Sequence, residues 1–249
     1  MILEILKDSL TYSLKDFNII ARLGILNLLS FLIVPFFLVQ GYSYNITTIG
    51  VNSIIHGKYE IPPFENWKNM FVNGIKRTLV MLIYSIPALI ISIWALLNPE
   101  TIQLIIPSNL LYLDIGIEIT AMIFLWIFTF ILIMVAIPHM IHRKSLKAAF
   151  NIKELITIIK SVGFLEYIYF VAWWIIIASG VIFLSFVAVE IFVSILNFIY
   201  LIIFSQIISL SFMNISFDMY LFGLVLILLV YPFLLIVESR ATASMYNLN

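Results

Sequence analysis

Long apolar runs alternate with short polar stretches along the whole chain. About 20 consecutive apolar residues form a helix long enough to cross the hydrocarbon core of a bilayer. Runs that approach this length cover residues 78–97, 115–138, 165–189 and 219–237. The pattern therefore predicts an all-α fold, a polytopic integral membrane helical bundle.

Three further stretches repeat apolar residues at helical spacing and place charged residues between them. They cover residues 1–16, 64–77 and 148–163. A helix of this kind has one apolar and one polar face, which is typical of helices that lie in the membrane interface. Tryptophan is enriched at the depth of the lipid headgroups, so Trp67 is expected to be an interfacial anchor.

Residues 17–57 decide the topology, because they can cross the membrane once or twice. Pro35 removes a backbone donor, and Gly41 permits the conformations of a tight turn. We expect a helical hairpin with arms at residues 17–40 and 41–57. A single crossing, or a second arm that lies on the membrane surface, remains an alternative.

The second arm of this hairpin carries polar side chains that hydrocarbon cannot satisfy. Asn45, Thr48 and Asn52 follow at helical spacing and are expected to turn away from lipid, toward other spans. These three residues are our candidates for a polar path.

The distribution of basic residues favours about six spans. Lys and Arg concentrate on the cytoplasmic side of membrane proteins. If the hairpin crosses twice and residues 191–213 stay outside as an apolar or re-entrant segment, all 13 Lys and Arg residues fall on one side. The chain is then a single cell-membrane domain, residues 1–249, with both termini in the cytoplasm. A seven-span version would place Arg240 outside.

Composition supports membrane residence and narrows the chemistry. The chain is 63% hydrophobic and its mean hydropathy is +1.16. Its net charge is zero, so no overall field favours nucleic acid as a partner. Cysteine is absent, which excludes disulfides and thiol chemistry.

The sequence contains no motif of a catalytic or cofactor site. His139 and His142 lie three residues apart, but no Glu stands beside the first, as zinc-protease motifs require. We interpret both as interfacial histidines at a basic helix end. No phosphate-binding loop, nucleophile elbow or dinucleotide fingerprint occurs. We therefore expect no enzyme activity, no cofactor and no metal.

Two classes of function remain open. The first is a small-solute transporter or channel-like protein, in which residues 41–57 line a polar path. The second is a non-catalytic scaffold or accessory protein that organises lipids or partner proteins through its surface helices. A hydrated cavity beside Asn45, Thr48 and Asn52 would favour the first. In both classes membrane lipids are the expected partners, and the sequence identifies no protein partner.

Several residues between Gly41 and Pro87 carry a family resemblance. They are Gly41 and Tyr42, the run Pro63, Phe64, Trp67, Phe71 and Gly74, and the pair Tyr84 and Pro87. With these residues and its span order, the chain resembles an archaeal membrane family common in methanogens, domain of unknown function four-thousand-and-thirteen. The resemblance covers most of the chain and is least clear after Glu190. It implies membrane location and architecture, and it supplies no catalytic residues.

Overall fold

The structure is a computed structural model that describes residues 1–52, 61–97, 111–204 and 215–249. In these residues the chain is helical, and they contain no β-strand. The helices are α1 (Ile2–Ser13), α2 (Phe17–Leu28), α3 (Val34–Val51), α4 (Trp67–Leu97), α6 (Leu111–His142), α7 (Ile152–Val162), α8 (Phe164–Phe204), α9 (Ile215–Val225) and α10 (Tyr231–Tyr246). Short turns join some of them: the 3-10 turns η1 (Ser30–Leu32) and η2 (Leu146–Phe150), and the π-helical turn η3 (Leu226–Val230).

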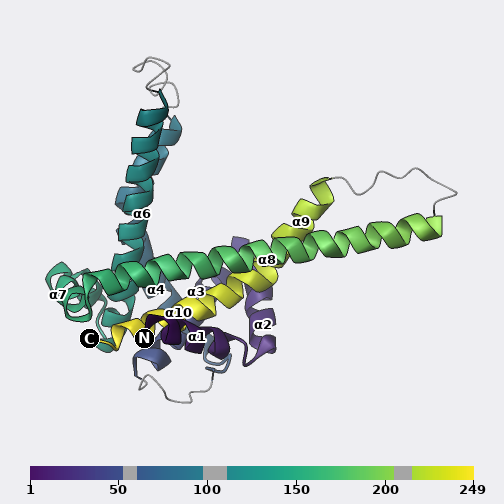
Figure 1. The fold of residues 1–249 in the computed structure, drawn as a ribbon. Coiled ribbons are helices and arrows are strands. Elements are labelled where there is room, and N and C mark those ends of the chain that lie inside the picture. Colours follow the sequence, from purple (N-terminus) through teal and green to yellow (C-terminus); the bar gives the residue numbers. More distant parts are fainter. Residues whose placement is uncertain (53–60, 98–110, 205–214) are drawn as a thin grey trace.

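The helices form a packed base from which two longer elements extend (Figure 1). Helices α1, α2, α3 and α10 pack together in the base, where both chain termini also lie. Helices α4 and α6 stand side by side and project from it, and α8 runs across it toward α9. The expected all-α fold is confirmed.

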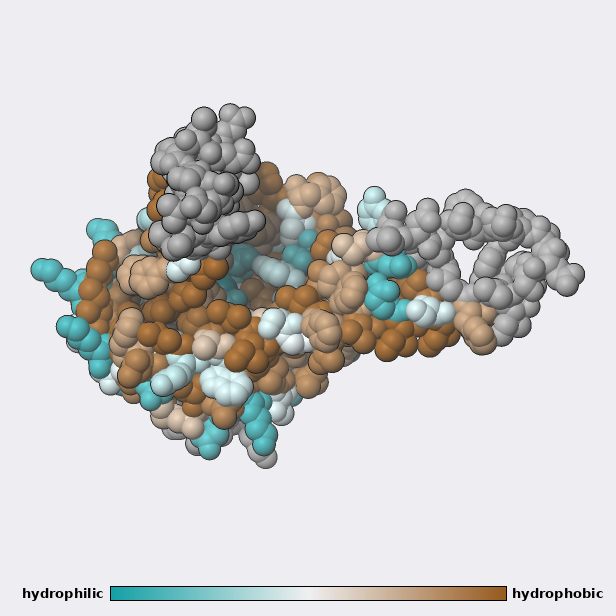
Figure 2. Space-filling model, turned by 45° about the horizontal axis from the view of Figure 1, so that its top comes forward, coloured by the Kyte–Doolittle hydropathy of each residue, from teal (hydrophilic) through white to brown (hydrophobic). Residues whose placement is uncertain are grey.

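Four helical segments within the described residues are long and apolar enough to cross a bilayer. They are Trp67–Trp94, Thr120–His142, Phe164–Leu196 and Asp218–Tyr246. Only 6% of the most apolar window of the third segment is buried inside the chain, so nearly all side chains of that window are available to lipid or to another helix. The surface in Figure 2 is correspondingly dominated by hydrophobic residues.

The hairpin expected over residues 17–57 has its break in a different place. The break between the helices α2 and α3 falls at residues 29–33, and α3 then continues through Gly41 to Val51. Pro35 lies in the first turn of α3. Backbone N–H groups in the first turn have no partner within the helix, so the proline costs no helical hydrogen bond there. The proline therefore starts the second helix, whereas we had expected it to end the first.

Two other expected boundaries are absent. Residues 64–77 and 78–97 were expected as a surface helix and a span, but the single helix α4 covers most of both. A break at Glu190 was implied by the expected segments 165–189 and 191–213. Instead α8 continues through Glu190 to Phe204, because the apolar residues on both sides keep one helix. Residues 205–213 lie outside the described residues.

The remaining boundaries agree more closely. Helix α1 falls within the expected residues 1–16, and α7 with the preceding turn η2 covers most of residues 148–163. Helix α6 extends the expected segment 115–138 at both ends. The last segment, expected at 219–237, continues as α9, η3 and α10 to Tyr246.

Two glycines bring α3 and α4 into backbone contact. A Cβ atom on Gly41 would overlap the carbonyl oxygen of Met70 in α4, and one on Gly74 would overlap the carbonyl oxygen of Phe37 in α3. Small residues at helix crossings in membranes allow this close approach. Gly41 therefore serves the crossing of α3 with α4, whereas the sequence had suggested a turn.

The π-helical turn η3 has a local cause. Pro232 has no N–H, so it cannot bond the carbonyl of Leu228, and the N–H of Tyr231 bonds Leu226 instead of Ile227. The freed Ile227 oxygen accepts a bond of 2.9 Å from the Asn27 amide of α2. A Cβ on Gly24 in α2 would overlap the Leu228 carbonyl, so α2 lies directly against this turn.

Candidate functional site

One face of α3 is both polar and buried. Gln40, Ser43 and Thr47 are exposed by 3% or less and lie at intervals of three and four residues, on one side of the helix. This side faces α4 and α10, which supply a further set of polar groups. We call the combined set the polar seam; its members are Gln40, Ser43, Thr47, Arg77, Tyr231, Glu238 and Ser239.

Arg77 is the centre of the polar seam. Only 2% of this residue is exposed, although it lies inside an apolar helix. Its Nη1 donates to the Ser43 hydroxyl, and its Nη2 lies 3.4 Å from Oε1 of Glu238. A positive and a negative charge therefore meet between α4 and α10, and the seam has no net charge.

The hydroxyl groups of the seam have a defined direction of donation. Ser239 donates to the carbonyl of Leu235 at 2.6 Å, and its oxygen meets that of Ser43. Since the Ser239 proton is already used, Ser43 must donate to Ser239 while it accepts from Arg77. The Thr47 hydroxyl is not part of this chain of hydrogen bonds and donates to the backbone carbonyl of Ser43 at 3.0 Å.

Two buried polar atoms of the seam have no hydrogen-bond partner among the described residues. They are Nε of Arg77, a donor, and Oε1 of Gln40, an acceptor. Both side chains approach Tyr231: Gln40 Nε2 donates to its hydroxyl at 3.2 Å, and Arg77 lies within electrostatic reach of it. A buried polar atom without a partner costs about 1–3 kcal/mol, so both atoms are suited to binding a small polar molecule.

A second buried arginine fixes α1 to α10. Arg240 is 2% exposed, its Nε lies 3.3 Å from Oδ2 of Asp8, and its guanidinium lies over the ring of Tyr12 at 5.1 Å. Burial raises the pKa of Tyr12 to about 12, and the charge of Arg240 opposes this shift. Tyr12 therefore stays neutral at physiological pH, and the contact is a cation–π interaction.

The two histidines take different positions at the end of α6. His139 is buried, with Nε2 at 2.8 Å from Glu154 and Nδ1 at 3.0 Å from the hydroxyl of Tyr246. His142 is exposed and lies 3.3 Å from the same hydroxyl. No group of three metal-binding side chains occurs among the described residues. The cluster joins α6, α7 and α10.

The residues expected to form a polar path lie on another side of α3. Asn45 is partly buried and accepts a bond of 3.3 Å from Asn73. Thr48 donates to the carbonyl of Tyr44 at 2.9 Å, and Asn52 is exposed at the end of the helix. The role of Asn45, Thr48 and Asn52 stays a prediction. The helical spacing was a usable signal, but it fitted both sides of α3 equally well.

Trp67 is the first residue of α4 and is 51% exposed. Its ring centroid lies 5.9 Å from that of Phe64, which in turn stacks on Tyr42 of α3 at 4.5 Å. The tryptophan therefore has one protein-facing and one open side. Its role as an interfacial anchor stays a prediction.

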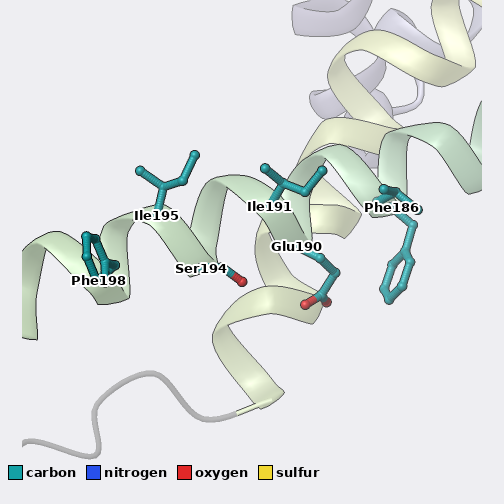
Figure 3. A pocket seen from close by; sticks show the side chains of 7 residues that line it. Phe186, Glu190, Ile191, Ser194, Ile195 and Phe198 are labelled. Atoms are coloured by element: carbon teal, nitrogen blue, oxygen red, sulfur yellow. The ribbon is translucent and has the colours of Figure 1, made fainter.

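An open groove of about 430 Å³ lies along α8. Its lining includes Phe186, Glu190, Ser194 and Phe198, all from this one helix (Figure 3). Glu190 and Ser194 point to one side of α8 in this view, and Ile191 and Ile195 to another. Because a single helix lines it, the groove is a surface furrow, and the polar seam is the better candidate site.

Comparison with known proteins identifies one family. Residues 28–193 match the model of the family described as "Protein of unknown function (DUF4013)". No curated protein and no solved structure matches the chain. The matched residues include Gln40, Ser43 and Arg77 of the polar seam and exclude the part contributed by α10. They amount to about two thirds of the sequence, and the chain belongs to the DUF4013 family.

Proposed function

We propose that this protein lets small, neutral, hydrogen-bonding solutes cross the membrane along the polar seam. The observation that carries the proposal is the pair of buried atoms without partners, Arg77 Nε and Gln40 Oε1. One is a donor and the other an acceptor, so together they suit a molecule that both accepts and donates. Water, alcohols and amides have this property.

The charge of the seam supports a neutral solute. The guanidinium of Arg77 is balanced by the carboxylate of Glu238 at 3.4 Å. An ion that entered beside this pair would be repelled by one member as it was attracted by the other. Ionisable residues inside membrane segments are costly and commonly mark solute pathways. We therefore place the path here. In this proposal the protein has no enzymatic role.

Proteoliposomes test this proposal. After a hyperosmotic shock with glycerol or urea, vesicles that contain the protein are expected to re-swell several-fold faster than protein-free vesicles, as followed by stopped-flow light scattering. The double variant Arg77→Met/Glu238→Met removes both charges together and is expected to behave like protein-free vesicles. Arg22→Met removes an exposed arginine of α2 and should leave the rate unchanged.

The wild-type result decides the outcome. If vesicles with the wild-type protein take up water, glycerol and urea no faster than empty ones, the transport proposal is wrong. A double variant that keeps the wild-type rate would place the path elsewhere, and Asn45, Thr48 and Asn52 would be the next candidates.

A non-catalytic scaffold is the second candidate, and α8 favours it. This helix has 41 residues, which corresponds to about 60 Å, and only 6% of its most apolar window is buried within the chain. Such a surface suits contact with lipids or with helices of other proteins. Inactive vesicles in the transport assay would leave this as the preferred function.

We further propose that both termini lie in the cytoplasm of the cell. Four crossings, with Trp67–Trp94 as the first, place every Lys and Arg outside the spans on one side. The six-crossing version, in which α2 and α3 also cross, gives the termini the same location. The positive-inside rule supports this arrangement for either number.

Reporter fusions test this topology. Fusions that end after Asp16 and after Asn249 are expected to give a cytoplasmic signal, and one within residues 98–110 an external signal. Signals from opposite sides for the two termini would mean an odd number of crossings. That result would contradict both the four-span and the six-span arrangement.

A further inference from the structure

Basic side chains gather where α6 ends and α7 begins. Residues 143–160 contain Arg143, Lys144, Lys147, Lys153 and Lys160, and all five are exposed. The one acid in this segment, Glu154, already bonds His139 at 2.8 Å and lies 3.7 Å from Arg143. The segment therefore presents a clear excess of positive charge.

Helix α7 has apolar residues on two sides. Leu155, Ile158 and Ile159 are buried and belong to the larger hydrophobic core. Ile152 and Ile156 lie one turn apart and are 56% and 43% exposed. The core therefore accounts for only one of the two apolar sides of the helix.

The exposed face of α7 carries apolar and basic residues next to one another. Ile152, Ile156 and Lys160 follow at intervals of four residues and are neighbours on this face, with Lys153 beside them. Figure 2 shows hydrophilic residues beside hydrophobic ones at the left edge of the molecule, where α7 lies. Lysines that border an apolar strip can lay their stems along it and place their charges at the headgroups.

The position of α7 in the chain fixes its relation to the membrane. It follows the candidate span that ends at His142 and precedes the one that begins at Phe164. A short helix between two spans must lie near one membrane surface. Basic clusters next to spans attract anionic lipids, and each Lys or Arg near the surface adds to this attraction.

We infer that this part of the molecule binds the phosphate headgroups of anionic membrane lipids, with the two isoleucines inserted among the acyl chains. We call it the α7 surface; it consists of Arg143, Lys144, Lys147, Ile152, Lys153, Ile156 and Lys160. The lysines alone would fit any polyanion, including nucleic acid. The exposed isoleucines beside them, and the position between two spans, favour a lipid surface.

Lipid titration of the full-length protein tests the inference. Purified protein in a neutral detergent is titrated with phosphatidylglycerol or with phosphatidylcholine, and the melting temperature is followed by intrinsic fluorescence. We expect phosphatidylglycerol to raise the melting temperature in a saturable way and phosphatidylcholine to have a much smaller effect. Glycerophosphoglycerol, which has the headgroup without acyl chains, should have no effect.

Two charge variants make the test specific. The variant Lys144→Gln/Lys147→Gln/Lys153→Gln/Lys160→Gln should need at least about tenfold more phosphatidylglycerol for half of the effect. Its matched control, Lys7→Gln/Lys15→Gln/Lys68→Gln/Lys76→Gln, changes net charge equally and should keep most of the wild-type response. A third variant, Ile152→Ser/Ile156→Ser, keeps the charges and should also weaken the response.

Each outcome bears on the inference. Equal losses in the two lysine variants would show a general charge effect and overturn the assignment to the α7 surface. A response to glycerophosphoglycerol or inorganic phosphate equal to that of the lipid would indicate a site for free anions. An unchanged response in the isoleucine variant would rule out insertion. Unaltered melting of all variants without added lipid is the check that they fold.

Discussion

Replacing Gly74 by alanine is expected to lower the melting temperature by roughly 6–12 °C. The new Cβ would overlap the carbonyl oxygen of Phe37 and lie against the backbone nitrogen of Gly41, and backbone atoms cannot rotate away as a side chain does. Overpacking of this kind costs about 3 kcal/mol, and 1 kcal/mol shifts the midpoint by roughly 2–4 °C in a chain of this size. Thermal unfolding in detergent, followed by tryptophan fluorescence, measures the change.

The chain offers a matched control for this substitution. Gly180 lies inside α8, and a Cβ added there would meet no atom within 4 Å. Gly180→Ala should therefore leave the melting temperature unchanged or raise it slightly, since alanine is the better helix former. If Gly74→Ala melted with the wild-type protein, the close crossing of α3 and α4 would be wrong. Gly41→Ala should destabilise the Gly74→Ala variant less than it destabilises the wild-type protein, because both substitutions act on the same crossing.

Replacing Arg77 by methionine is expected to destabilise the protein by about 3–5 kcal/mol. The change leaves the carboxylate of Glu238, whose side chain is only 22% exposed, without its cation and leaves Ser43 without the donor it accepts from. Adding Glu238→Met removes the stranded charge and should restore most of the loss, because an apolar pair can replace a buried ion pair at little net cost. A double-mutant cycle of melting temperatures measures the coupling.

The control for Arg77 is an arginine outside the interior. Arg22 of α2 is exposed, so Arg22→Met should shift the free energy of unfolding by about 0.5 kcal/mol or less. Equal effects of Arg77→Met and Arg22→Met would mean that the buried ion pair does not exist. A double variant no more stable than Arg77→Met would place the stabilising contacts of Arg77 on Ser43 rather than on Glu238.

The fold class could be predicted from the sequence because a bilayer sets a simple physical requirement. A helix must offer about 20 apolar residues to cross it, and the runs at 78–97, 115–138, 165–189 and 219–237 all lie largely within helices. The boundaries were harder to predict. Gly41 and Pro35 were expected to mark the end of a helix. Instead Gly41 contacts the backbone of Met70 in α4, a partner distant in the sequence, and Pro35 lies in the first turn of α3.

The candidate site was the least predictable part. Polar residues occur on two sides of α3, and the sequence cannot tell which side meets Arg77 and Ser239. Arg77 itself follows Lys76 and resembles the basic end of a surface helix. In the structure one step of the helix separates a partly exposed Lys76 from a buried Arg77. That distinction arises from the packing of α4 against α3 and α10, which no local pattern records.

The π-helical turn between α9 and α10 also sets the rotational phase of the last part of the chain. An α-helix advances by 100° for each residue, and a π-helical turn holds one residue more than the α-helical turn it replaces. Phe222 meets Phe186 of α8 edge-on, with 5.3 Å between ring centroids, only because this extra residue lies between it and the base. Loss of one residue from Leu226–Val230 would restore a regular helix and turn Phe222 about 100° away from α8. A single-residue deletion within Leu226–Val230 would therefore break the contact between Phe222 and Phe186, although neither residue lies in the deleted segment.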